Sequence, residues 1–225
     1  MKNWPIDLII DSLDRKVPTL AADEISKALR DGGAGKSLVD FLTPLYTVAA
    51  GGTFFGGALR VLPLNGNHRK KSLGLLDWNR PDEWRSSAPV AASQAFYFMS
   101  NSFGDLLGVP VGEDLEIAKD RVCILWVDQY AFESSAKAWA DILRKALVGE
   151  DHMDVFLSRR KDHEWAQNFL GTVKPHESFA WTIPPRIGGP EEIDNITIGG
   201  LALNVSFTLQ LLRQQLQANQ GPALR

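Results

Sequence analysis

The chain has 225 residues, of which 44% are hydrophobic and 23% are charged, and its formal net charge is −3. This is the composition of a globular protein that can bury a sizeable core, and the slight excess of acid argues against a nucleic-acid-binding domain, which is normally basic. The single cysteine, Cys123, rules out an internal disulfide and a cysteine-based zinc cluster. It lies in the apolar run VCILWV, so we expect a buried, unreactive thiol.

The N-terminal segment MKNWPIDLIIDSLDRK lacks the pattern of a signal peptide, because Asp7 and Asp11 interrupt its short apolar run. No window approaches the roughly 18 consecutive apolar residues of a membrane-spanning helix. We therefore expect a cytoplasmic protein that does not enter a membrane.

The first part of the chain is predicted to be helical up to a corner rich in glycine. In the stretch YTVAAGGTFFGGALRVLPL, two glycine pairs bracket Phe54 and Phe55, and an apolar strand pattern follows up to Pro63. Glycine tolerates positive φ and close backbone approach, so this stretch predicts a tight corner that leads into a buried strand. The expected elements are a short helix or arm over 4–13, a helix over 20–30, a helical segment over 38–46 and a strand over 57–62.

The middle of the chain reads as a run of strands separated by turns. Residues 94–99 and 105–111 form a predicted hairpin around the turn at 101–104. Residues 121–128 give the strongest strand signal in the chain, because β-branched and aromatic side chains dominate there.

The last third is predicted to be mainly helical. A helix capped by Ser134 or Ser135 runs to Leu147, and another spans 151–170. Residues 179–189 are expected to be irregular, 192–198 to form a short strand, and 204–217 to form an amphipathic helix.

This order predicts an α+β fold, an antiparallel β-sheet meander flanked by N-terminal and C-terminal helices. We expect a single domain with N-terminal helices over 1–50, a sheet core over 51–130, and C-terminal helices with an extension over 131–225.

Chemically suggestive groups are few, and each has an ordinary structural interpretation. Gly32 to Ser37 reads GGAGKS, like the end of a phosphate-binding loop, but Arg30 stands where that motif needs its first glycine. The histidines lack the spacing of a helical metal site, and acid pairs fall in predicted loops. The run from Arg159 to Lys161 is expected to form the solvated face of a helix. We therefore predict no catalytic, cofactor-binding or metal-binding residue.

One segment, DWNRPDEWR from Asp77 to Arg85, places two tryptophans among charges. Trp and Arg are favoured in the energetic centres of protein interfaces. Two interpretations stay open here: Trp78 and Trp84 cap the core, or they form the rim of a partner-binding surface.

Taken together, five segments resemble the SUKH superfamily (SMI1/KNR4), and in particular its bacterial immunity proteins. They span about residues 35–200 and are LTPLYTVAAGGTFFGGALRVLPL, QAFYFMSNSFGDLLGVPVG, RVCILWVD, ESSAKAWADILRKAL and PHESFAWTIPPRIGGPEEIDNITIG. Ala50 departs from the family pattern, which often has asparagine before the glycines.

The resemblance implies a cytoplasmic immunity protein that binds a cognate secreted polymorphic toxin and covers its active site, with no cofactor and no enzymatic activity. The candidate partner-binding residues are Trp78, Asp82, Trp84, Asp128, Gln129 and Tyr130. Two alternatives remain: a small-molecule- or nucleotide-binding regulatory domain that uses the GGAGKS loop, and an unrecognised hydrolase.

Overall fold

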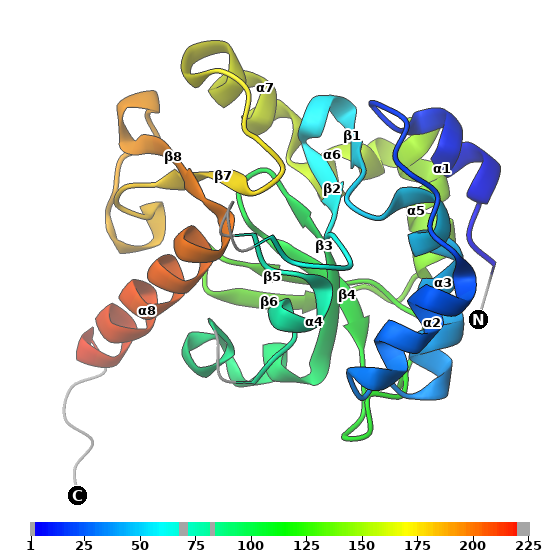
Figure 1. Cartoon of the computed structure of the whole chain (residues 1–225). Coiled ribbons are helices and arrows are strands. Elements are labelled where there is room, and N and C mark those ends of the chain that lie inside the picture. Colours follow the sequence, from blue (N-terminus) through cyan, green and yellow to red (C-terminus); the bar gives the residue numbers. More distant parts are fainter. Residues whose placement is uncertain (1–2, 68–71, 82–83, 220–225) are drawn as a thin grey trace, which may run out of the picture.

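A computed structural model describes residues 3–67, 72–81 and 84–219. At its centre lies a six-stranded antiparallel sheet whose strands follow one another in chain order from β1 to β6 (Figure 1). A separate two-stranded antiparallel sheet pairs β7 with β8. The strands are β1 Thr53–Phe54, β2 Leu59–Val61, β3 Ala95–Asn101, β4 Leu106–Pro110, β5 Cys123–Trp126, β6 Ala131–Ser134, β7 Glu177–Trp181 and β8 Ile196–Gly200.

Helices precede, interrupt and follow the central sheet, so the α+β fold expected from the sequence is confirmed. They are α1 Ile6–Ser12, α2 Ala22–Asp31, α3 Lys36–Ala49, α4 Leu75–Trp78, α5 Trp139–Leu147, α6 Met153–Ser158, α7 Arg160–Leu170 and α8 Leu201–Asn219. Short 3-10 turns lie at Phe55–Gly57, Trp84–Ser87, Val90–Gln94, Glu150–His152, Pro185–Ile187 and Ile193–Asn195.

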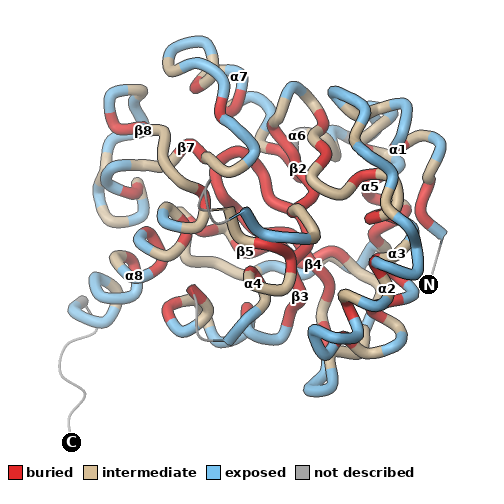
Figure 2. Tube along the Cα trace, viewed as in Figure 1, coloured by how far each residue is buried: buried red, intermediate tan, exposed pale blue. Residues whose placement is uncertain are grey.

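Both faces of the sheet are covered, which explains why its strands read as continuous apolar runs. Side chains alternate between faces along a strand. In β5, Ile124 joins the core shared with α1, α2, α3 and α5, whereas Cys123 and Leu125 join the core shared with α4 and α8. Figure 2 shows the result, with buried residues concentrated in the central strands and exposed residues on the outer helices and loops.

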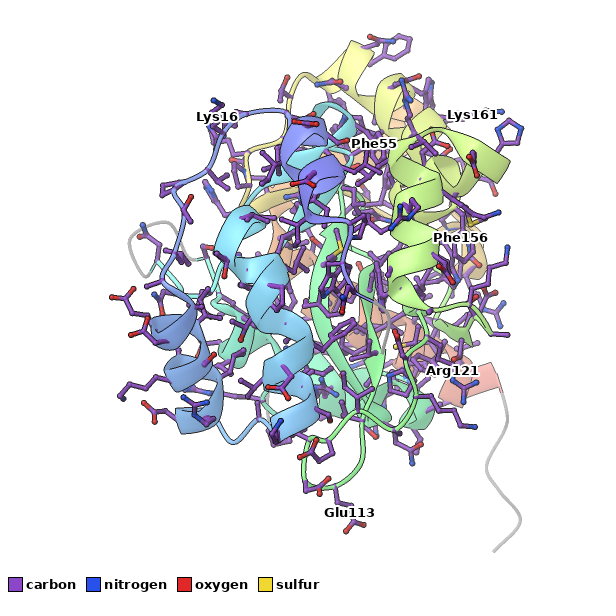
Figure 3. The ribbon with its side chains drawn as sticks, turned by 90° about the vertical axis from the view of Figure 1, so that its right-hand side faces the viewer. Lys16, Phe55, Glu113, Arg121, Phe156 and Lys161 are labelled. Atoms are coloured by element: carbon purple, nitrogen blue, oxygen red, sulfur yellow. The ribbon has the colours of Figure 1, made fainter. Side chains whose placement is uncertain are left out.

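An aromatic cluster anchors the N-terminal helices and α5 to the sheet. The ring centroids of Trp4 and Phe41 lie 4.8 Å apart, and those of Phe98 and Trp139 lie 4.9 Å apart. The Trp139 indole N–H donates to the carbonyl of Gly108 at 2.8 Å, so its polar atom is satisfied inside the core. In Figure 3, which faces this helical layer, the N-terminal helices lie in front of the sheet on one side, and Phe156 marks α6 on the other.

The glycine corner has the geometry that its sequence predicts. Gly51, Gly56 and Gly57 have φ values of 72°, 69° and 94°, and the strand β2 that follows is fully buried. The carboxylate of Asp14 accepts hydrogen bonds from the amides of Gly56 and Gly57, each at 2.9 Å. The corner therefore binds an anion that the chain itself supplies.

Three boundary predictions are wrong, each because tertiary pairing overrides local preference. Residues 131–134 extend the sheet as β6, so the sheet continues past 130 and α5 begins only at Trp139. Residues 179–181 belong to β7, which pairs with β8, although this Pro/Gly-rich region was expected to be irregular. The helix predicted over 151–170 is broken at Arg159, whose φ of 50° is left-handed.

Candidate functional site

A surface cavity of about 670 Å³ lies where the β5–β6 turn, the start of α7 and the chain after β7 meet. Acidic, basic and tryptophan side chains line it together. The lining residues are Asp128, Gln129, Arg159, Asp162, Trp165, Trp181, Pro185, Arg186 and Glu191.

Arg159 is the structural centre of this cavity. It occupies the left-handed break between α6 and α7, and its side chain is only 14% exposed. Its Nη1 lies 2.8 Å from Oδ2 of Asp128 and 3.4 Å from Oδ2 of Asp105. The guanidinium also stacks 4.4 Å from the ring centroid of Phe103. The break in the helix thus places the Arg159 guanidinium beside two carboxylates, Asp105 just before β4 and Asp128 just after β5.

Asp162, in the first turn of α7, holds the other side of the same guanidinium. Its Oδ2 accepts from Nε of Arg159 at 2.9 Å, and its side chain is 49% exposed. Arg159 therefore contacts two sheltered carboxylates and one that reaches solvent. This arrangement fixes the orientation of α7 against the sheet.

Asp105 is the deepest member of the cluster and is completely buried. It accepts hydrogen bonds from Nδ2 of Asn101 and from the amide of Val127, both at 2.8 Å. Burial and the neighbouring charge of Asp128 raise its pKa to about 6, against the opposing effect of Arg159. The burial of a second acid beside one cation makes its charged form costly.

Two tryptophans form the aromatic part of the cavity. The indole N–H of Trp181 donates to Oδ2 of Asp128 at 2.9 Å, and the rings of Trp165 and Trp181 have centroids 6.4 Å apart with a 41° tilt. Both side chains are half-buried. Oδ1 of Asp128 is buried and has no hydrogen-bond partner in the described part of the chain. Asp128 thus keeps one buried acceptor unused while its other oxygen binds the indole N–H of Trp181.

Of the predicted partner-binding residues, three lie at or next to the Arg159 cavity and two lie in the core. Asp128 and exposed Gln129 line the cavity, and half-buried Tyr130 follows them in the β5–β6 turn. Asp82 lies outside the described residues. Whether any of these residues touches a partner stays a prediction.

Trp78 and Trp84 cannot serve as exposed anchors, which corrects that part of the prediction. Their exposed fractions are 2% and 1%, and the indole N–H of Trp84 donates to the carbonyl of Trp78 at 3.1 Å. They pack in the core shared with α8, as the alternative core interpretation held. Arg85 closes this region by donating to Asn79 Oδ1 at 2.8 Å and to the Ala95 carbonyl at 2.7 Å.

The sequence interpretation missed Arg159, Trp165 and Trp181. The expected solvated helix face is correct for Arg160 and Lys161, which are exposed, and wrong for Arg159. Lys161 points away from the body of the molecule in Figure 3. The one available signal was the unusual content of seven tryptophans, two of which line this cavity.

The phosphate-loop-like segment already binds a carboxylate of the chain. The amides of Lys36 and Ser37, at the start of α3, each donate to the carboxylate of Glu116 at 2.7 Å. The Ser37 hydroxyl also donates to Glu116, and these hydrogen bonds lower the pKa of that acid. A Cβ on Gly35 would lie 2.6 Å from the Glu116 side chain, so the glycine serves this internal contact. A phosphate would have to displace Glu116.

His163, the residue after Asp162 in α7, has a structural role. It is buried, and its Nδ1 lies 2.9 Å from the Ser102 hydroxyl. Burial lowers its pKa, so the neutral ring is favoured. Among the residues that the structure describes, no three His, Cys, Asp or Glu side chains gather as a metal site.

Comparison with known proteins defines the fold but not the family. No family model and no curated protein matches the chain. The crystal structure of Atu4351 from Agrobacterium tumefaciens is similar, with a TM-score of 0.54, 11% identity, and coverage of 91% of this chain and 88% of that one. At such identity the likeness concerns the fold alone. Within the described ranges, no helix combines the length and apolarity needed to span a membrane.

Proposed function

We propose that this protein is a cytoplasmic immunity protein of the SUKH type that binds one cognate secreted toxin and covers the toxin's active site, without catalysing a reaction itself. The sequence resemblance suggests the class. The observation that carries the proposal is the face around the Arg159 cavity, where two half-buried tryptophans and exposed polar groups lie beside exposed apolar side chains.

Those apolar side chains belong to α8. Leu203 is 70% exposed and Phe207, one turn later, is 58% exposed. Their neighbours Asn204 and Thr208 line a small cavity together with Asp128 and Trp181, so α8 flanks the Arg159 cavity. Protein–protein interfaces combine apolar anchors with surrounding polar groups, and Trp and Arg are enriched among their energetically dominant residues.

The cavity is also preorganised for binding. The ion pairs around Arg159 and the bond from Trp181 to Asp128 hold its walls before any partner arrives. A rigid surface loses little conformational freedom on association, which favours tight one-to-one complexes.

The decisive test begins with a pull-down that identifies the partner, followed by rescue from toxicity on co-expression. Leu203→Asp and Phe207→Asp are expected to weaken toxin binding in calorimetry by at least about 30-fold each, the scale of an interface hot spot. Lys161→Asp, on the exposed face of α7, is the matched control and should keep rescue intact. Full rescue by the Leu203/Phe207 double variant, with unchanged affinity, would disprove this interface.

The second candidate, a nucleotide-binding regulator, rests on the GGAGKS segment. Because Glu116 occupies the amides at the start of α3, this candidate has the weaker support.

A further inference from the structure

We infer that the Arg159 cavity receives an arginine side chain of the toxin, an inference that rests on the proposed function and names the chemistry of the partner's central contact. The inference starts from the charges. Four carboxyl groups, those of Asp105, Asp128, Asp162 and Glu191, lie in or directly behind the cavity, against the two guanidinium groups of Arg159 and Arg186. The site therefore has an excess of negative charge that suits a cationic guest.

The acceptors that would meet such a guest are in place. Glu191 is exposed and has no hydrogen-bond or ion-pair partner among the described residues. Asp162 uses Oδ2 for Arg159 while half of its side chain faces solvent. Together they offer carboxylate oxygens at the open side of the cavity.

The aromatic faces supply the second element of cation recognition. The rings of Trp165 and Trp181 lie 6.4 Å apart, and tryptophan is the side chain on which cations stack best. A planar guanidinium stacks on such faces and can form two parallel hydrogen bonds to one carboxylate, whereas a lysine ammonium is more strongly hydrated and less suited to stacking.

The protein already recognises one guanidinium in this way. Arg159 stacks on Phe103 at 4.4 Å and pairs with Asp128 and Asp105. Trp181 continues the same aromatic row, 6.3 Å from Phe103. A guest arginine stacked on the open face of Trp181 or Trp165 and paired with Glu191 would repeat this arrangement one layer nearer the surface.

The test needs no knowledge of the toxin. Three tripeptide probes, Ac-Gly-Arg-Gly-NH₂, its citrulline analogue and its lysine analogue, are titrated into the full protein while the indole ¹H–¹⁵N signals are followed by NMR. Trp165→Phe and Trp181→Phe assign the two signals. Citrulline keeps the shape of arginine without its charge, so it separates cation recognition from simple filling of a hole.

We expect saturable shifts of the Trp165 and Trp181 signals with the arginine probe and at least 10-fold weaker binding of both analogues. Glu191→Gln should weaken the arginine probe several-fold, and Arg186→Ala should strengthen it, because a like charge leaves the rim. Glu150→Gln, in the exposed turn before α6, is the matched control and should change nothing. Equal shifts with the citrulline or lysine probe, or no shift at these two signals, would overturn the inference.

The same variants separate this inference from the proposed function. If the toxin binds through α8 and Glu191→Gln leaves its affinity unchanged, the arginine contact is wrong and the immunity role stands. If the arginine probe binds as expected but no toxin is captured or neutralised, the proposed function fails while the cation site stands.

Discussion

Nη1 of Arg159 lies 2.8 Å from Oδ2 of Asp128, and this ion pair joins the start of α7 to the β5–β6 turn. The two residues are 31 positions apart, and the pair forms only because the chain leaves the helical conformation at Arg159. Trp181 donates to the same carboxylate oxygen, so one atom connects the central sheet, α7 and the β7–β8 sheet. The cavity exists because these three parts meet there.

Arg159→Met should lower the free energy of unfolding by about 3–5 kcal/mol, because it leaves Asp105 and Asp128 sheltered without their cation. Urea denaturation followed by tryptophan fluorescence measures the change. Arg160→Met is the matched control: its ion pairs with Asp154 and Glu164 are partly exposed, and surface pairs contribute less than about 1 kcal/mol. Equal effects of the two substitutions would contradict the central role of Arg159.

Asp105 should make the protein less stable as pH rises through the weakly acidic range. Its folded pKa of about 6 lies above the unfolded value of about 3.9, so its favourable contribution is complete below about pH 4 and is lost by about pH 6. Asp128, Asp162 and Arg159 face the same cluster and remain in an Asp105→Asn variant. The stability of that variant relative to the wild type should therefore rise by up to about 3 kcal/mol between those pH values.

The lowered pKa of His163 works in the opposite direction, because it adds stability as pH rises towards about 6.5. His163 is present in both proteins, so its contribution cancels in the comparison. Urea titrations of the wild type and Asp105→Asn across this range give the difference curve. A flat curve would show that Asp105 is not the titrating group.

Gly56→Ala should cost about 1–2 kcal/mol, the strain of a left-handed backbone with a Cβ atom. The φ of Gly56 is 69°, and no atom lies within 4 Å of the added Cβ, so packing does not contribute. Gly112→Ala is the control, because the φ of Gly112 is outside the left-handed region and the added Cβ would lie 3.4 Å from Oδ1 of Asp114, an ordinary contact. Thermal or urea unfolding of both variants compares their stabilities directly. If Gly56→Ala unfolds like the wild type, position 56 does not require a left-handed backbone.

Added phosphate or ATP should leave the melting temperature of the wild-type protein unchanged, because the Glu116 carboxylate holds the amides of Lys36 and Ser37. Glu116→Ala should melt at a lower temperature and recover part of the loss when phosphate is added, since the start of α3 then lacks an anion. Differential scanning fluorimetry with matched chloride controls measures this. A shift in the wild type that disappears in Lys36→Ala would instead favour the nucleotide-binding alternative.

Cys123 should not react with a disulfide reagent such as DTNB while the protein is folded. The side chain is fully buried, and burial raises the pKa of its thiol to about 12, so almost no thiolate is available. In denaturant the same thiol should react at once. Since this is the single cysteine of the chain, the absorbance reports on it alone. Rapid reaction of the native protein would indicate an opening of the core around β5.

Local sequence patterns determined much of the backbone. The run of β-branched and aromatic residues around Cys123 predicted β5, the turn at 101–104 predicted the β3–β4 hairpin, and the glycine pairs predicted the corner before β2. Each of these signals depends on conformational preference or on burial, and both act within a few residues of the chain. The α+β meander followed from their order.

The tertiary structure alone decided which side chains meet. Glu116 reaches Lys36 across 80 positions, Trp78 and Trp84 enter the core although charges surround them in sequence, and the left-handed turn at Arg159 breaks an otherwise helical pattern. These outcomes depend on long-range pairing and desolvation, which no local window contains. The candidate site is also decided by the tertiary structure, because its charged groups and aromatic rings come from segments that only the folded chain brings together.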